Sequence, residues 1–237
     1  MKKYTLLAVF MLVVVATIAT QLIIEKTDGT QHPFEINQIQ NITFSNDVQG
    51  IILEDDFESY ELNTFPTSGG WSIGYNGAGN QYQYITDQYS YQGSKSFRLL
   101  GASSWGAQMD NLLTDTPDVI YFEASFYSES TSHEGSFGLR NPNVGTWGTG
   151  ITGVAFYDGM ISIGSNEITE YVPEQWYKIR VKADLSNNKL SGWINDTIVL
   201  DEVDCTYSTV PYTHFYLHAR NDGTNLVFFG NVKVWTE

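Results

Sequence analysis

Apolar and polar residues alternate along short segments throughout residues 51–237. The clearest segments are residues 121–127, 177–182 and 214–220, and in the last of them Phe215, Leu217 and Ala219 occupy every second position. A period of two predicts β-strands that bury one face and expose the other. Turn-forming pairs such as Asp158-Gly159 separate the segments at roughly the 8–12 residue spacing of an all-β sandwich. We therefore expect an all-β fold in which two antiparallel sheets pack face to face.

The first twenty residues have the pattern of a secretory signal peptide. Lys2 and Lys3 form a basic start, residues 6–18 are apolar apart from Thr17, and a small residue follows at Ala19. The apolar stretch is shorter than the roughly 20 residues that cross a bilayer. We expect residues 1–19 to be removed on export, so that the protein is secreted or lies at the cell surface. A retained N-terminal anchor is the alternative.

Residues 20–49 form a short leader before the main body, which we place at residues 50–237. In the leader, residues 22–25 and 34–36 flank Asp28-Gly29, a pair typical of a tight β-hairpin turn. Together with Thr30 and the run Ile42-Thr43-Phe44-Ser45, this stretch resembles the leader found after the signal peptide in many exported proteins of the Bacteroidetes.

Composition and charge exclude several classes of function. The 237 residues contain 12 Lys and Arg against 27 Asp and Glu, a formal net charge of −15. So acidic a chain lacks the basic surface that nucleic acids and anionic membranes require. The single cysteine, Cys205, excludes an internal disulfide and any multi-cysteine metal site. No segment after the signal peptide is long and apolar enough to span a membrane.

The order of several short motifs resembles concanavalin A-like, or LamG-like, jelly-roll modules. These motifs are residues 54–60 (EDDFESY), Phe65-Pro66, Gly70-Trp71, residues 93–99 (GSKSFRL), residues 176–181 (WYKIRV) and residues 229–234 (FGNVKV). The resemblance covers about 185 residues and implies a jelly-roll sandwich. It leaves function open, because lectins, glycanases, lyases and spacers share this fold.

The same resemblance implies one cofactor, a structural calcium ion where the first and last strands meet. Its side-chain ligands here would be Asp55, Asp56 and Asn231, with backbone carbonyls completing a shell of six to eight oxygens. Gly230 stands where the family often has an Asp, which weakens this prediction.

Candidate ligand-binding residues lie on the polar side of one strand. Side chains at alternate positions of a strand share a face, so His214, Tyr216, His218 and Arg220 form one polar and aromatic surface. If residues 121–127 belong to the same sheet, Tyr121, Glu123 and Tyr127 extend this surface into the floor of a groove. Aromatic platforms for sugar rings are also expected at Tyr82, Tyr84 and Trp147.

These features predict an exported, non-catalytic module that binds a neutral glycan or serves in surface attachment. The alternative is a glycan-active enzyme on the same fold, a glycoside hydrolase before a polysaccharide lyase. The run Glu54, Asp56 and Glu58 would supply a hydrolase with neighbouring carboxylates if its strand were extended throughout. Against this, the central strands hold Glu123 and Glu134 singly rather than as a pair.

Overall fold

The computed structural model describes residues 21–25, 31–35, 50–75, 82–101, 106–146, 148–220 and 225–236, with the backbone alone for the first two segments and Tyr75. Contacts divide the chain into two units, Met1–Asp47 and Val48–Glu237. In the first unit, β1 (Gln21–Glu25) pairs antiparallel with β2 (Gln31–Glu35), as a hairpin leader requires. The predicted signal peptide lies outside the described residues.

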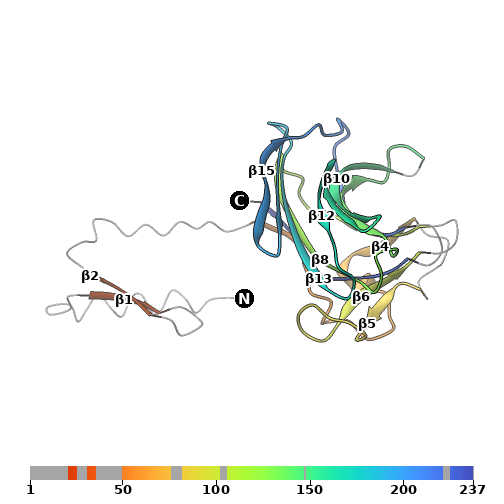
Figure 1. Cartoon of the computed structure of the whole chain (residues 1–237), viewed down its shortest axis with the longest axis horizontal. Coiled ribbons are helices and arrows are strands. Elements are labelled where there is room, and N and C mark those ends of the chain that lie inside the picture. Colours follow the sequence, from red (N-terminus) through yellow and green to blue (C-terminus); the bar gives the residue numbers. More distant parts are fainter. Residues whose placement is uncertain are drawn as a thin grey trace. The chain divides into compact units, whose positions relative to one another are not determined.

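The second unit is an all-β sandwich of two antiparallel sheets, as the alternation predicts (Figure 1). The seven-stranded sheet has, in spatial order, β12 (Asn166–Glu170), β11 (Met160–Ile163), β10 (Thr149–Tyr157), β9 (Gly135–Asn141), β16 (His214–Ala219), β7 (Ala107–Leu112) and β4 (Trp71–Tyr75).

The eight-stranded sheet faces the seven-stranded one. Its order is β15 (Thr197–Asp204), β14 (Lys189–Ile194), β13 (Trp176–Asp184), β8 (Val119–Ser128), β17 (Leu226–Thr236), β6 (Ser96–Leu100) and β5 (Tyr84–Thr86), while β3 (Gly50–Asp55) pairs with the C-terminal half of β17. A short 3-10 helix, η2 (Thr67–Gly69), precedes β4.

Aromatic side chains from both sheets fill the core. Phe122 of β8 meets Phe215 of β16 with ring centroids 6.1 Å apart, and Phe126 of β8 stacks on Phe156 of β10 at 3.7 Å. All four are fully buried. Apolar area removed from water is the main stabilising term in such a core, so the inward positions of each strand fix which face its other residues present to solvent.

One prediction about the groove floor is wrong. Strand β8 lies in the eight-stranded sheet between β13 and β17, whereas β16 lies in the seven-stranded sheet between β9 and β7. Tyr121, Glu123 and Tyr127 therefore face away from the β16 surface, on the opposite side of the sandwich. Period-two alternation shows which residues of a strand share a face but carries no information about its sheet, and this is why the grouping failed.

None of the helices in the described segments is long and apolar enough to cross a membrane.

Candidate functional site

The outer face of the seven-stranded sheet carries a polar cluster at its centre. We define the polar cluster by residues from three adjacent strands: Gln108, Asp110, Ser136, Arg140, His214, Tyr216 and His218. The β-ladder sets their positions: Tyr216 lies opposite Asp110, and His218 lies between Gln108 and Ser136. The inward neighbours Phe215 and Leu217 are fully buried, so the predicted orientation of β16 is confirmed.

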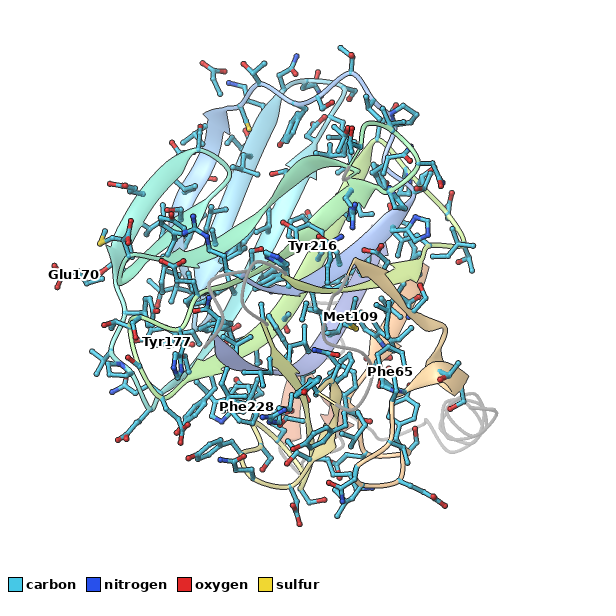
Figure 2. The ribbon with its side chains drawn as sticks, turned by 90° about the vertical axis from the view of Figure 1, so that its right-hand side faces the viewer. Phe65, Met109, Glu170, Tyr177, Tyr216 and Phe228 are labelled. Atoms are coloured by element: carbon cyan, nitrogen blue, oxygen red, sulfur yellow. The ribbon has the colours of Figure 1, made fainter. Side chains whose placement is uncertain are left out.

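Neighbouring positions in the ladder show the two faces clearly. Met109 of β7 and Tyr216 of β16, both labelled in Figure 2, come from paired strands. Met109 is completely buried in the core, whereas Tyr216 is half-buried on the outer face. The polar cluster is thus a direct product of strand alternation.

An internal ion pair anchors the polar cluster. One guanidinium nitrogen of Arg140, Nη1, lies 3.2 Å from each carboxylate oxygen of Asp110, and the two side chains are only 5% and 3% exposed. Gln108 adds a hydrogen bond to the same carboxylate. Burial raises the pKa of Asp110, although Arg140 opposes the shift. Because this pair is buried and mutually neutralised, it positions its neighbours rather than offering a free charge to a ligand.

Two glycines make room for the ion pair. A Cβ atom on Gly74 would overlap the Asp110 carboxylate, and one on Gly148 would overlap the Arg140 guanidinium. Gly148 also has a φ of 77°, in the left-handed region that favours glycine. The backbone on both sides of the pair is therefore able to close over it.

The two histidines of the polar cluster are electrically neutral near pH 7. Burial, together with the nearby positive charges of Arg140 and Arg220, lowers the pKa of His218 to about 4. Its Nδ1 atom lies 3.3 Å from the Ser136 hydroxyl. Burial also lowers the pKa of His214, which pairs with the Thr213 hydroxyl at 2.8 Å. Neutral imidazoles both donate and accept hydrogen bonds.

Shallow hollows adjoin Tyr216 and His218. His218 borders one of about 320 Å³ together with Tyr157 and Arg220. Tyr216 borders another of about 290 Å³ that includes Thr152, whose buried hydroxyl has no hydrogen-bond partner among the described residues. Burial raises the pKa of Tyr216, so its phenol stays protonated and acts as a donor. The polar cluster thus places the Tyr216 phenol and the His218 ring beside two open hollows.

Arg220, the remaining candidate of this strand, follows the end of β16 and is also neutralised. Its Nη1 atom lies 2.6 Å from a carboxylate oxygen of Glu134, and its guanidinium sits 3.8 Å from the ring centroid of Tyr157. The second Glu134 oxygen accepts the amide of Asp158. The charges beside the polar cluster therefore satisfy one another.

The other predicted aromatic residues lie away from the polar cluster. Tyr84 belongs to β5 of the eight-stranded sheet and is covered by Arg98, 4.8 Å from its ring centroid. Tyr82 precedes this strand and is 38% exposed. Tyr127 is buried on the outer face of β8 by stacking on Tyr89 at 4.4 Å. Trp147 lies outside the described residues.

The hydrolase interpretation of the N-terminal carboxylates meets a structural obstacle. Strand β3 ends at Asp55, and Phe57 has a φ of 63°, so the chain turns before Glu58. Glu58 instead accepts hydrogen bonds from the amides of Ser94 and Lys95. Glu54, Asp56 and Glu58 consequently do not share one extended strand, so the condition that the hydrolase alternative placed on this run is not met.

Asp55, a proposed calcium ligand, already accepts three hydrogen bonds. Its Oδ1 atom accepts the Phe57 amide, and its Oδ2 atom accepts the Tyr60 hydroxyl at 2.6 Å and the indole N–H of Trp71 at 2.8 Å. A calcium ion would compete with these donors. Asn231 donates its amide to Gln92 and keeps its oxygen for other partners. Calcium binding by Asp55, Asp56 and Asn231 stays a prediction, which the melting temperature with and without EDTA checks.

Sequence reasoning missed Gln108, Asp110, Ser136 and Arg140. A signal was present, because Gln108 and Asp110 alternate with the buried Ala107 and Met109. What the sequence does not contain is the pairing that brings residues about 30 positions apart into one buried ion pair.

No family model and no curated protein matches this sequence. Among solved structures, the chain is similar to a GH131 beta-glucanase catalytic domain from Podospora anserina, with a TM-score of 0.56 and 11% identity over 79% of this chain and 96% of that one. Domain 4 of AbnA, a GH43 extracellular arabinanase from Geobacillus stearothermophilus solved with arabinotriose, gives a TM-score of 0.52 and 13% identity over 79% and 92%. A sialidase gives 0.56 and 9%, covering 78% of this chain, which spans only 19% of the sialidase. At these identities the likeness establishes the β-sandwich fold.

Proposed function

We propose that this protein is an exported, non-catalytic module that binds a neutral glycan through the polar cluster of the seven-stranded sheet. The observation that carries the proposal is the self-neutralised charge of this face. Asp110 is paired with Arg140, Glu134 with Arg220, and burial keeps the histidines uncharged. A polar cluster with hydrogen-bonding groups, in which the charges of the described residues are paired, suits a ligand rich in hydroxyls and without charge of its own.

The available groups match what a sugar needs. The Tyr216 phenol is a donor, and the neutral His218 ring has Nε2 in addition to the Nδ1 atom that contacts Ser136. Tyr157, 39% exposed beside the hollow, offers part of an aromatic ring for sugar C–H groups. Open, shallow hollows favour weak binding of a chain that passes along the surface.

Catalysis is the second candidate. Tyr216 and His218 lie two residues apart on one face with shifted pKa values, as a proton-transferring pair in a lyase would. A lyase also needs a cation for the substrate carboxylate, but Arg140 and Arg220 already have carboxylate partners. The two sandwich domains described above, one a beta-glucanase catalytic domain and one solved with arabinotriose, support a glycan-related role of either kind.

A glycan array followed by calorimetry on the best ligand tests the proposal. Tyr216→Phe removes one hydroxyl and should weaken binding about fivefold, since a hydrogen bond contributes about 1 kcal/mol. Tyr82→Phe, the same change beside β5 of the other sheet, is the matched control and should leave binding unchanged.

The outcomes separate the candidates. Loss of binding in Tyr82→Phe but not in Tyr216→Phe would place the site elsewhere. Release of reducing ends, or of unsaturated ends that absorb in the ultraviolet, would show that the protein is an enzyme. The absence of any array ligand would remove the glycan proposal altogether.

A further inference from the structure

Positive charge gathers on the outer face of the eight-stranded sheet, on the far side of the core from the polar cluster. Residues 50–237 contain nine Lys and Arg, and four of them point outward here: Lys178, Arg180, Lys182 and Lys233. Their inward neighbours on β13, Ile179, Val181 and Ala183, are fully buried, which fixes the direction of the first three. Glu123 lies among them, opposite Arg180 of β13 and Lys233 of β17 in the ladder.

Aromatic rings lie beneath these cations. Each of three cations sits over a ring, at 4.7, 5.8 and 5.3 Å from the ring centroid: Arg180 over Trp193, Lys182 over Tyr121, and Lys233 over Trp235. Tyr121 and Trp235 also stack on each other, with centroids 5.3 Å apart. Cation–π contacts hold the charged groups in place above the sheet.

A hollow of about 340 Å³ opens on this face at β13, β14 and β15. It is lined by Arg180, Lys182 and Trp193 on the central strands and by Asp201 and Glu202 on the edge strand β15. Tyr121 and Trp235 border it on the other side. The hollow therefore combines cations, carboxylates and aromatic rings.

The two cations in the hollow differ from the others on this sheet. Lys178 is paired with Asp196 at 2.7 Å and Lys189 with Asp204 at 2.6 Å. Arg180 and Lys182 form no ion pair with any carboxylate in the described part of the chain. The Nε atom of Arg180 is also buried and has no hydrogen-bond partner there. Arg180 and Lys182 therefore lack the close carboxylate partner that Arg140 and Arg220 have beside the polar cluster.

A β-bulge shapes the rim of the hollow. The register between β14 and β15 shifts at Gly192, and Glu202 has a φ of 46°, unusual for a residue other than glycine. The Glu202 amide donates a hydrogen bond to the Ser191 hydroxyl at 3.0 Å. Bulges re-aim side chains and are frequent beside functional sites, and this one occurs where Asp201 and Glu202 border the hollow.

The geometry points to a second binding site in this hollow, for a sugar that carries a carboxylate. Arg180 and Lys182 provide charge-assisted hydrogen bonds to the carboxylate. The half-exposed Trp193 side chain, whose ring also holds Arg180, provides apolar contact for the sugar C–H groups, and Asp201 and Glu202 accept hydrogen bonds from its hydroxyls. A neutral sugar leaves both cations unmatched, and a simple inorganic anion leaves the ring and the acceptors unused.

The net negative charge of the chain does not prevent this binding. Exposed charges more than about 8 Å apart are largely screened at physiological ionic strength. The groups within contact distance of the ligand then dominate its electrostatic energy. In the hollow these are Arg180 and Lys182, which face the carboxylate, and Asp201 and Glu202, which accept hydrogen bonds from the hydroxyls.

Calorimetry with trigalacturonate and trimannuronate tests the site, with galactotriose and mannotriose as their neutral counterparts. We expect at least one acidic probe to bind about tenfold or more tightly than its neutral counterpart and to quench tryptophan fluorescence. Lys182→Gln and Arg180→Gln should each weaken this binding about tenfold, which corresponds to about 1.4 kcal/mol.

Lys178→Gln is the matched control. It removes the same charge from the same face of the same strand, but from a lysine that is already paired with Asp196. It should change the affinity by less than about twofold, because its charge is not available to the ligand. Thermal melts check that each variant is folded. If Arg180→Gln lowers the melting temperature, the affinities of Lys182→Gln and Lys178→Gln are compared instead.

Three results would overturn the proposal: neither acidic probe binds, a neutral probe binds as tightly as its acidic counterpart, or Lys178→Gln weakens binding as much as Lys182→Gln. Tyr216→Phe on the opposite sheet should leave binding of the acidic probe unchanged. Failure of this site and failure of the neutral-glycan proposal are therefore distinguishable.

Discussion

Burial of His218 couples the stability of the fold to pH. The ordinary histidine pKa of 6.5 falls to about 4 in the folded protein. A group whose folded pKa is lowered holds its proton less tightly in the folded state, so its contribution to stability is present above about pH 6.5 and is lost as the pH falls towards 4. We expect the stability advantage of the wild type over His218→Gln to shrink across this window, as measured by urea unfolding at several pH values.

Comparison with the variant isolates this histidine from other titrating groups. Asp110 acts in the opposite direction, because its raised pKa favours the folded state as the pH falls, but it is present in both proteins. Direct titration of the His218 ring by NMR provides a second readout. A midpoint near 6.5 would show that the imidazole is solvated and would remove it from the buried part of the polar cluster.

The buried pair of Asp110 and Arg140 should behave asymmetrically on mutation. Arg140→Met leaves the Asp110 carboxylate buried without its partner and should cost about 3–5 kcal/mol of unfolding free energy. The double variant Asp110→Leu with Arg140→Met removes both charges and should recover most of that loss. A double-mutant cycle by chemical denaturation measures the difference, and additive effects of the two single changes would mean that the pair is solvated.

At the scale of elements, Asp55 joins the end of β3 to two segments that follow it. Asp55→Ala leaves the Tyr60 hydroxyl and the buried indole N–H of Trp71 without their acceptor. An unsatisfied buried donor costs about 1–3 kcal/mol, so we expect a loss of about 3 kcal/mol for the two together. Asp56→Ala, at an exposed neighbour, should stay within about 0.5 kcal/mol. Equal losses in the two variants would contradict the anchoring role of Asp55.

The sequence predicted elements better than it predicted how they meet. The alternation in residues 214–220 correctly assigned Phe215 and Leu217 to the core, because apolar side chains at period two are sufficient to choose a face. It did not reveal that β8 and β16 belong to different sheets, since that depends on pairing between distant segments. The same limit hid the contact between Asp110 and Arg140, and it hid the turn at Phe57 that separates Asp56 from Glu58.

At the scale of the molecule, the two outer faces of the sandwich differ in how their charges are used. Around the polar cluster, Arg140 and Arg220 each have a carboxylate partner. On the opposite face, Arg180 and Lys182 have none among the described residues. Because one core supports both sheets, two ligands of different charge could be held by one rigid body, and variants on one face should not alter binding to the other.

The sandwich should fold without the N-terminal unit. The buried core cluster of the described residues runs from Phe57 to Val234, all within the unit Val48–Glu237. A protein that begins at Val48 should therefore melt within about 2 °C of the chain that retains the leader. A second truncation that begins at Asp56 is the control, because it also removes β3, its pairing with β17 and the Asp55 anchor. This second truncation should lose several kcal/mol of unfolding free energy. Each kcal/mol lowers the melting temperature by about 2–4 °C, a change that differential scanning calorimetry resolves. A large drop for the protein that begins at Val48 would instead show that the leader stabilises the sandwich.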